Sequence, residues 1–211
     1  MPMKIWSDSF EHRGRIPAEF AMGTPEGFGA NRNPHLAWDG APQGTRSFAL
    51  LCIDTDAPTD ASLAGRDDVE IPVAHPRGEF VHWVLVDVPA TTHHIEAGSC
   101  SDGISKRGKP ALGKPASAGL EGTRQGLNDY TGWFANDPAM RGDWRGYDGA
   151  FPPPHDLRLH RYFFRVFALD VARLDVPARF TAGDVLQAMQ GHVLGEASIY
   201  ATYSLNPAVK D

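Results

Sequence analysis

The sequence predicts a mainly β protein, a β-rich α+β fold with a helix near its C-terminus. Three apolar runs rich in Val, Phe and Leu have the length of buried strands: 47–55, 80–88 and 160–169. The chain also contains 22 Gly and 17 Pro among its 211 residues, which indicates many turns and long connections rather than a helix bundle. The composition has no break along the chain, so we expect a single domain over residues 1–211.

The shorter elements are predicted from local patterns between turn residues. The remaining candidate strands are 4–10, 20–22, 35–38, 125–130 and 197–205. Long connections are expected where polar, Gly-rich or Pro-rich stretches show no clear period. These connections are 59–78, 91–118 and 136–158. Connections of this length often shape a binding site.

The one predicted helix begins after Thr181. Thr181 and Asp184 have the spacing of a capping box, in which the side chain of each residue bonds the backbone of the other. An apolar face at helical spacing follows, and it is expected to pack on the core. Its members are Val185, Leu186, Met189 and Val193.

Composition excludes several classes of protein. The net charge of -6 and the pI near 5.8 argue against a nucleic-acid partner, because binding to a phosphate backbone needs a basic face. Cys52 and Cys100 are too few for a disulfide framework and are expected to be unpaired thiols. We find no signal peptide and no stretch that could span a bilayer, so we expect a cytoplasmic protein without stable membrane insertion.

Polar residues gather where the three central strands begin or end. Asp54 and Asp56 close the first run, His82 lies near the start of the second, and His160 and Tyr162 open the third. The end of one strand abuts the start of its antiparallel neighbour, so these side chains are expected at one rim of a sheet. Two neighbouring carboxylates beside apolar surface need cations or hydrogen-bond donors. Each histidine alone fits an ordinary core residue; the combination predicts a polar pocket.

Two neighbours of these residues are assigned structural roles. Arg161 alternates to the face opposite His160, so it is expected to be an ion-pair partner rather than a ligand contact. Trp83 alternates away from His82 and is expected in the core. The sequence contains no P-loop, dinucleotide-binding, nucleophile-elbow or zinc-protease motif, and we expect no metal and no cofactor.

These motifs, in this order, resemble those of the phosphatidylethanolamine-binding protein family, and most closely its bacterial branch often labelled Raf-kinase-inhibitor-like. The resemblance covers roughly residues 35 to 205. The motifs that carry it are Asp54-Thr-Asp56-Ala-Pro58, His82-Trp83 and Leu159-His160-Arg161-Tyr162, the last of them after Pro152-Pro-Pro154.

The resemblance implies two antiparallel sheets packed as a sandwich, with a helix near the C-terminus. It also implies a small rim pocket for phosphate or for a phosphorylated head group such as phosphoethanolamine. Carried over residue by residue, the ligand-binding residues would be Asp54, Asp56, His82, Phe151, Pro152, His160 and Tyr162.

Three features depart from the family pattern. Arg158 stands where the family usually has glycine, which adds a positive charge expected at the pocket mouth. Phe151 is bulkier than the small residue expected there and is predicted to narrow the pocket. The stretch 60–78 is longer than in animal relatives. The partner-binding surfaces of those relatives are therefore not carried over to this chain.

The favoured function is noncatalytic binding of a small anion, with a regulatory or inhibitor role as a secondary expectation. His82 and His160 would donate N–H groups and Tyr162 a hydroxyl, while Asp54 and Asp56 would orient the imidazoles and hold them partly protonated. No serine, cysteine or lysine in the motifs is an evident nucleophile, so the protein is not expected to be an enzyme.

Two alternatives remain open at this point. One is a hydrolase that uses an Asp–His pair as a general base, and the other is an interaction module that inhibits a kinase or protease, with the protein partner unknown. A homodimer is also possible, because the aromatic residues of the long connections are expected to form an exposed apolar patch. These residues are Trp133, Phe134 and Trp144.

Overall fold

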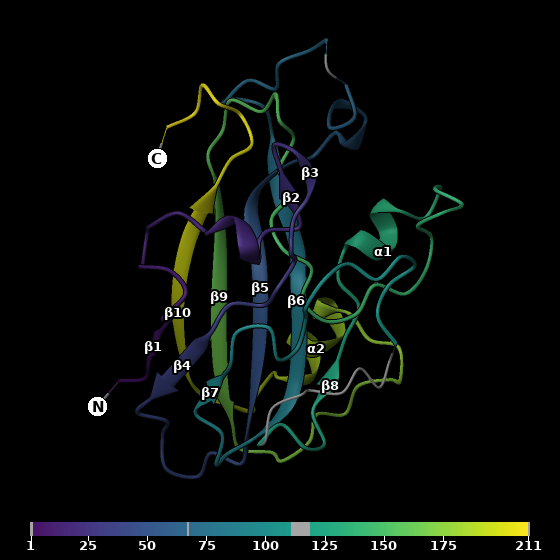
Figure 1. The fold of residues 1–211 in the computed structure, drawn as a ribbon. Helices are drawn as coiled ribbons and strands as arrows, with labels where there is room; N and C mark the ends of the chain where they lie inside the picture. Colours follow the sequence, from purple (N-terminus) through teal and green to yellow (C-terminus); the bar gives the residue numbers. More distant parts are fainter. Residues whose placement is uncertain (1, 67, 111–118, 211) are drawn as a thin grey trace.

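Two antiparallel sheets and one short hairpin make up most of the regular structure (Figure 1). The computed structural model describes residues 2–66, 68–110 and 119–210. The larger sheet has the strand order β10-β9-β5-β6-β8. Its strands are β5 (Ser47–Pro58), β6 (Arg77–Pro89), β8 (Arg124–Gln125), β9 (His160–Leu169) and β10 (Val193–Tyr203).

The smaller sheet has the order β1-β4-β7, and helix α2 lies on the other side of the molecule. The smaller elements are β1 (Lys4–Trp6), β4 (Leu36–Asp39), β7 (His94–Ile95), the hairpin strands β2 (Gly23–Thr24) and β3 (Gly27–Phe28), the helices α1 (Tyr130–Trp133) and α2 (Ala182–Ala188), and the 3₁₀ turns η1 (Ala18–Phe20) and η2 (Ala61–Leu63). The predicted β-rich fold with two antiparallel sheets and a late helix is confirmed.

The centre of the larger sheet is buried on both faces, most completely along β5 and the later part of β6, which explains the continuous apolar runs of these strands. On β5, Phe48 and Leu50 face a core shared with Trp38 of the smaller sheet. Leu51 points the opposite way, into a second core that contains Val185 of α2. The smaller sheet and α2 therefore cover opposite faces of the same central strands.

The central hairpin is longer than its apolar runs. β5 continues to Pro58 and β6 begins at Arg77, with Pro58 opposite Arg77 at the end of the ladder. Pairing uses backbone groups, so it extends past the last apolar side chain into polar sequence. The expected connection 59–78 is shortened accordingly and contains the turn η2.

Other boundaries also differ from the prediction. The first strand stops at Trp6, and 20–22 is no strand but contains the last residue of the turn η1 and the two residues after it. The segment 125–130 contains the end of β8 and the start of α1. The connection 91–118 contains β7, and its residues 111–118 lie outside the described residues.

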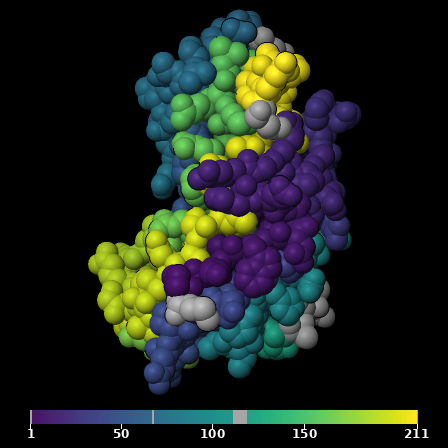
Figure 2. Space-filling model, turned by 90° about the vertical axis from the view of Figure 1, so that its left-hand side faces the viewer, coloured from purple at the N-terminus to yellow at the C-terminus, as the bar shows by residue number. Residues whose placement is uncertain are grey.

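The N-terminal segment covers the outer edge of β10. The N–H groups of Arg13 and Ile16 donate to the carbonyls of Tyr200 and Thr202, both at 2.8 Å, and Thr202 N–H donates to the carbonyl of Gly14. Figure 2 shows this segment in purple lying across the yellow C-terminal strand. Such cover keeps part of an edge strand from pairing with another chain.

Helix α2 begins at the predicted capping box. The Thr181 N–H donates to Asp184 Oδ2 at 2.8 Å, and the Asp184 N–H donates to Thr181 Oγ1. The helix is shorter than predicted, because Gly191 adopts φ +81° and turns the chain back into β10. Val193 therefore belongs to the strand and not to the helix. None of the described helices is long and apolar enough to cross a bilayer.

The two faces of α2 supply a matched pair of substitutions. Val185 is fully buried, whereas its neighbour Leu186 is 43% exposed. We expect Val185→Ala to lower the free energy of unfolding by about 2 kcal/mol, since it removes buried methyl groups and leaves a cavity. Leu186→Ala should change it by less than about 0.5 kcal/mol. Urea denaturation of both variants tests this, and equal losses would contradict the assigned helix face.

Candidate functional site

A cavity of about 210 Å³ lies where β5 ends and where β6 and β9 begin. In the sheet register Asp54 pairs with Phe80 on one side and with Tyr162 on the other, so the predicted meeting of three strand ends is confirmed. The polar residues that line the cavity are Asp54, His82, Tyr130, His160 and Tyr162. Its walls are largely apolar and include Phe28, Phe80, Trp133, Phe134, Phe151, Pro152, Pro153 and Pro154.

His160 is held between two carboxylates. Its Nδ1 contacts Asp54 Oδ2 at 2.7 Å and its Nε2 contacts Asp156 Oδ2 at 3.1 Å. Burial alone would lower the pKa of His160, but the hydrogen bonds to Asp156 and Asp54 prevail and raise it to about 9. His160 is therefore an imidazolium at neutral pH, with both N–H groups already donated. It does not offer the free N–H donor expected from the sequence.

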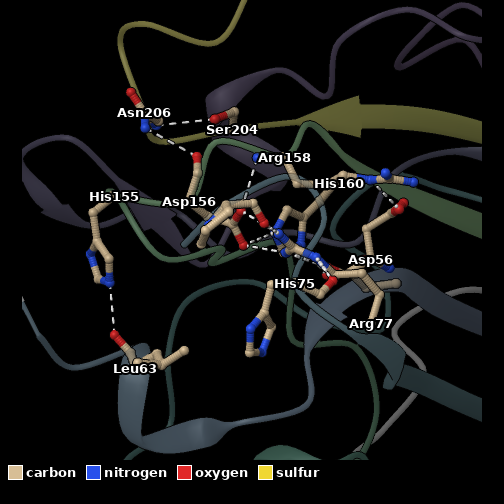
Figure 3. Close-up of polar contacts among 12 residues, drawn as sticks. Asp56, Leu63, His75, Arg77, His155, Asp156, Arg158, His160, Ser204 and Asn206 are labelled. Carbon is tan, nitrogen blue, oxygen red and sulfur yellow. Dashed lines mark hydrogen bonds and ion pairs between the residues drawn. The ribbon is translucent and has the colours of Figure 1, made fainter. Parts of the chain in front are cut away.

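Asp156 anchors this histidine to the connection that precedes β6 (Figure 3). Arg77 donates to both Asp156 oxygens, at 2.5 and 2.9 Å, and also to the carbonyls of Pro72 and Asp56. Burial opposes ionisation of Asp156, but His160 and Arg77 lower its pKa to about 2. Asn206, beyond β10, donates to the Asp156 carbonyl at 3.1 Å. One carboxylate thus joins segments distant in sequence.

Asp56 is not among the residues that line the cavity. Its oxygens accept from Arg161 Nε at 2.8 Å and from Arg158 Nε at 2.9 Å. Burial opposes its ionisation, yet these two arginines lower the pKa of Asp56. The ladder between β5 and β6 shifts register between Asp54 and Ala57, and such an irregularity re-aims side chains. The two aspartates therefore have different partners.

Arg158 and Arg161 both donate hydrogen bonds to the Asp56 carboxylate. Arg161 is the structural ion-pair partner that was predicted. Arg158 also bonds Asp56, so much of the charge expected at the pocket mouth is offset within the protein. Like Asp56, neither arginine lines the cavity.

His82 is buried, and burial lowers its pKa despite the opposing effect of Asp54 and other carboxylates. It is therefore neutral at pH 7. Its Nδ1 lies 2.7 Å from the carbonyl oxygen of Asp148. A carbonyl only accepts, so Nδ1 carries the proton and Nε2 keeps a lone pair. Nε2 makes no hydrogen bond with the described residues, and it is an acceptor rather than the donor predicted from sequence.

Tyr162 lines the cavity between the two histidines, with ring centroids 5.1 Å from His82 and 6.4 Å from His160. Its hydroxyl is buried and makes no hydrogen bond of normal geometry with the described residues. Burial, and then the nearby Asp54 carboxylate, raise the pKa of Tyr162 well above its usual value. The phenol is therefore protonated, and its O–H can turn to a ligand or to the nearby Asp54 carboxylate.

The predicted loop residues Phe151 and Pro152 both line the cavity. The Phe151 ring lies edge-on to Phe28 of the hairpin β2–β3, with centroids 5.8 Å apart. A Cβ atom built on Gly23 would lie 2.0 Å from the Phe151 ring, so only glycine leaves room for the ring at this position. The N-terminal hairpin and the Pro-rich loop therefore form one wall together.

Helix α1 adds a wall that sequence analysis did not predict. Tyr130, Trp133 and Phe134 come from this helix or its end and line the cavity. The exposed aromatic patch expected there is not formed, because Trp144 is fully buried with Tyr130 while only Trp133, at 43%, is well exposed. The homodimer proposed from that patch stays a prediction.

Three residues important to the site were missed: Arg77, Asp148 and Asp156. Asp156 had a usable signal, since it stands four residues before His160 in a Pro-rich loop. Arg77 gave only a weak one, as a basic residue at the start of a strand. Asp148 gave none, because it acts on His82 through its backbone carbonyl.

Comparison with known proteins places the chain in a family. A sequence model of the phosphatidylethanolamine-binding protein family matches residues 6–204. The chain belongs to this family. It is 32% identical to a UPF0098 protein of Methanothermobacter thermautotrophicus over 201 residues, which cover 95% of this chain and 98% of that protein. It is 31% identical to the UPF0098 protein YbhB of Escherichia coli, over 96% and 100% of the two chains.

Solved structures of family members have the same fold. The crystal structure of E. coli YbcL, described as a new member of the mammalian PEBP family, matches with a TM-score of 0.70 at 23% identity, over 97% of this chain and 99% of that one. A phosphatidylethanolamine-binding protein homologue from Chlamydia trachomatis matches with a TM-score of 0.65 at 24% identity, over 100% and 99%.

The contacts of His160 with Asp54 and Asp156, here called the His160 clamp, predict how the free energy of unfolding depends on pH. A pKa raised to about 9 contributes stability that is fully present below the unfolded value near 6.5 and is lost as the pH rises through about 9. The lowered pKa of Asp156 acts at the other end, with stability lost as the pH falls through about 2. We expect the free energy of unfolding to fall by roughly 3 kcal/mol between about pH 6.5 and 9.5.

Urea denaturation across this pH range measures the loss. In His160→Gln the alkaline slope should be largely absent, because the titrating group is gone. His192→Gln is the matched control, since His192 also contacts an aspartate, Asp170 at 2.8 Å, but is 43% exposed. A slope unchanged in His160→Gln would contradict the clamp.

Proposed function

We propose that this protein reversibly binds a small molecule with an acidic head group, such as phosphate or a phosphomonoester, without converting it. The observation that carries the proposal is the pair of unused polar groups in the cavity, the Tyr162 hydroxyl and His82 Nε2. A buried polar atom without a partner, such as the Tyr162 hydroxyl, is costly in the empty protein, and a ligand that bonds it recovers that cost.

Local charge supports an anion as the ligand. The Asp54 carboxylate would repel it, but the His160 imidazolium contacts Asp54 directly at 2.7 Å and keeps its charge at neutral pH. An incoming anion therefore meets a compensated pair rather than an isolated negative charge. Apolar walls exclude water from this pair and strengthen each hydrogen bond formed there. The same walls can hold an apolar part of the ligand.

The membership of the family supports the same class of ligand, since the family is named for binding phosphatidylethanolamine. The cavity volume of about 210 Å³ suits a compact head group. This support is independent of the two unused polar groups, which come from the geometry of this chain alone.

The state of His160 argues against a hydrolase in which the Asp54–His160 pair is the general base; for His82, whose Nε2 keeps a lone pair, the lack of a nucleophile in the described lining argues against hydrolysis. A general base must accept a proton, but His160 is already protonated at neutral pH and both its ring nitrogens contact carboxylates. Among the described residues, the cavity lining includes no serine, cysteine or lysine to act as a nucleophile. Turnover of a phosphoester that disappears in Asp54→Asn would favour the hydrolase instead.

Tyr162→Phe tests the proposal by removing one oxygen atom. We expect phosphate affinity, measured by isothermal titration calorimetry, to fall by about tenfold or more, because a hydrogen bond to a charged group is lost. The free energy of unfolding without ligand should stay equal or rise, since the hydroxyl has no partner in the described residues.

Tyr200→Phe is the matched control, because Tyr200 lies on β10 and does not line the cavity. It should bind phosphate as the unchanged protein does. The proposal fails if the unchanged protein does not bind phosphate, or if Tyr162→Phe binds it equally well.

A further inference from the structure

We propose that the cavity selects oxyanions that carry a proton of their own, so that it binds phosphate and protonated phosphomonoesters in preference to sulfate. The inference rests on the proposed function, which it narrows to a ligand class. It follows from the hydrogen-bonding character of the groups that face the ligand.

The first step is the tautomer of His82. Its Nδ1 donates to the Asp148 carbonyl at 2.7 Å, while the Asp148 N–H donates to the His82 carbonyl at 3.0 Å. The backbone of Asp148 thus bonds both the ring and the main chain of His82. Because a carbonyl has no proton to give, the proton of the neutral ring stays on Nδ1 and Nε2 presents a lone pair.

The second step is that Asp148 cannot easily turn away. Its carboxylate is fully buried and accepts from Asn31 Nδ2 at 2.8 Å, Asn128 Nδ2 at 2.8 Å and Lys109 Nζ at 2.6 Å. These three donors come from separate parts of the chain. Their bonds fix the loop whose carbonyl holds His82, so the side chain of Asp148 positions His82 from outside the cavity.

The third step is the remaining polar surface. Both oxygens of Asp54 already accept, one from the Asp56 N–H at 2.8 Å and one from His160 Nδ1 at 2.7 Å. Asp54 has only further lone pairs to offer a ligand. The N–H groups of His160 are also taken. Among the described side chains of the lining, the Tyr162 hydroxyl is the unbonded donor that lies beside the two acceptors, Asp54 and His82, while the Trp133 indole N–H is a second unbonded donor on the half-exposed wall of α1.

The consequence is a requirement on the ligand. Sulfate has no proton at neutral pH, so it would set its own lone pairs against those of His82 Nε2 and Asp54. Phosphate keeps a P–OH that can donate to Nε2 while its other oxygens accept from Tyr162. Burial keeps His82 from supplying the missing proton, although the carboxylates of Asp54, Asp129 and Asp148 act in the opposite direction.

The test compares inorganic phosphate with sulfate on the unchanged full-length chain by titration calorimetry at about pH 7. We expect phosphate to bind at least about tenfold more tightly, since sulfate leaves buried acceptors facing each other. If both bind within about threefold of each other, the inference is wrong but the proposed function stands. If neither binds, both are wrong.

An ester pair distinguishes a phosphorylated head group from free phosphate. Methyl phosphate has a second pKa of about 6, so it carries a P–OH at about pH 5.5 but not at about pH 8.5. We expect it to exceed methyl sulfate at the lower pH and to match it at the higher one. Inorganic phosphate, which keeps a P–OH at both, should remain the tighter ligand. Methyl phosphate that keeps its preference at about pH 8.5 would overturn the inference.

His82→Gln supplies the last control, because its amide can turn either a donor or an acceptor to the ligand. We expect the ratio of phosphate to sulfate affinity to fall to about threefold or less. His94→Gln, on an exposed residue of β7, should leave the ratio unchanged. Nitrogen-15 NMR of the unchanged protein should show His82 protonated at Nδ1 alone, and a proton on Nε2 at about pH 7 would refute the assignment.

Discussion

The ion pairs of His160 hold the candidate site together. A single imidazolium contacts Asp54 at the end of β5 and Asp156 in the Pro-rich loop, and Arg77 continues the chain of charges to the start of β6. Without that positive charge, two buried carboxylates would face each other without compensation, which is costly in a low-dielectric interior. The relative position of the loop and the two strands therefore depends on a proton that His160 keeps at neutral pH.

The same interaction determines what the cavity can offer to a ligand. From the sequence, Asp54 and Asp56 would make the pocket acidic. In the structure Asp56 bonds Arg158 and Arg161 instead, and Asp54 bonds His160. Both carboxylates are thus paired with cationic side chains of the protein itself. A neutral histidine and a phenol remain for recognition, inside walls made largely of aromatic and proline side chains. We therefore expect this cavity to discriminate between ligands by hydrogen-bond character more than by net charge.

The fold was predictable where burial leaves a local pattern of apolar residues in the sequence. β5, β6 and the second half of β9 are buried on both faces along their apolar runs, so these runs stand out, and the capping box of α2 has a fixed spacing. The boundaries were less accessible. β6 extends to Arg77 because its backbone pairs with Pro58, and β10 takes Val193 because Gly191 turns the chain, neither of which depends on apolar periodicity.

The sequence by itself determined which strand ends meet, and so placed Asp54, His82, His160 and Tyr162 around one cavity, while the family resemblance added Phe151 and Pro152. Only the tertiary structure decided the role of each group. An irregular ladder separates Asp56 from the cavity, a second carboxylate from Asp156 occupies His160, and a backbone carbonyl sets the proton of His82. Residue type tells what a side chain can donate or accept. Which of those bonds is already used depends on partners that are distant in sequence, and these partners leave the Tyr162 hydroxyl and His82 Nε2 without a hydrogen bond among the described residues.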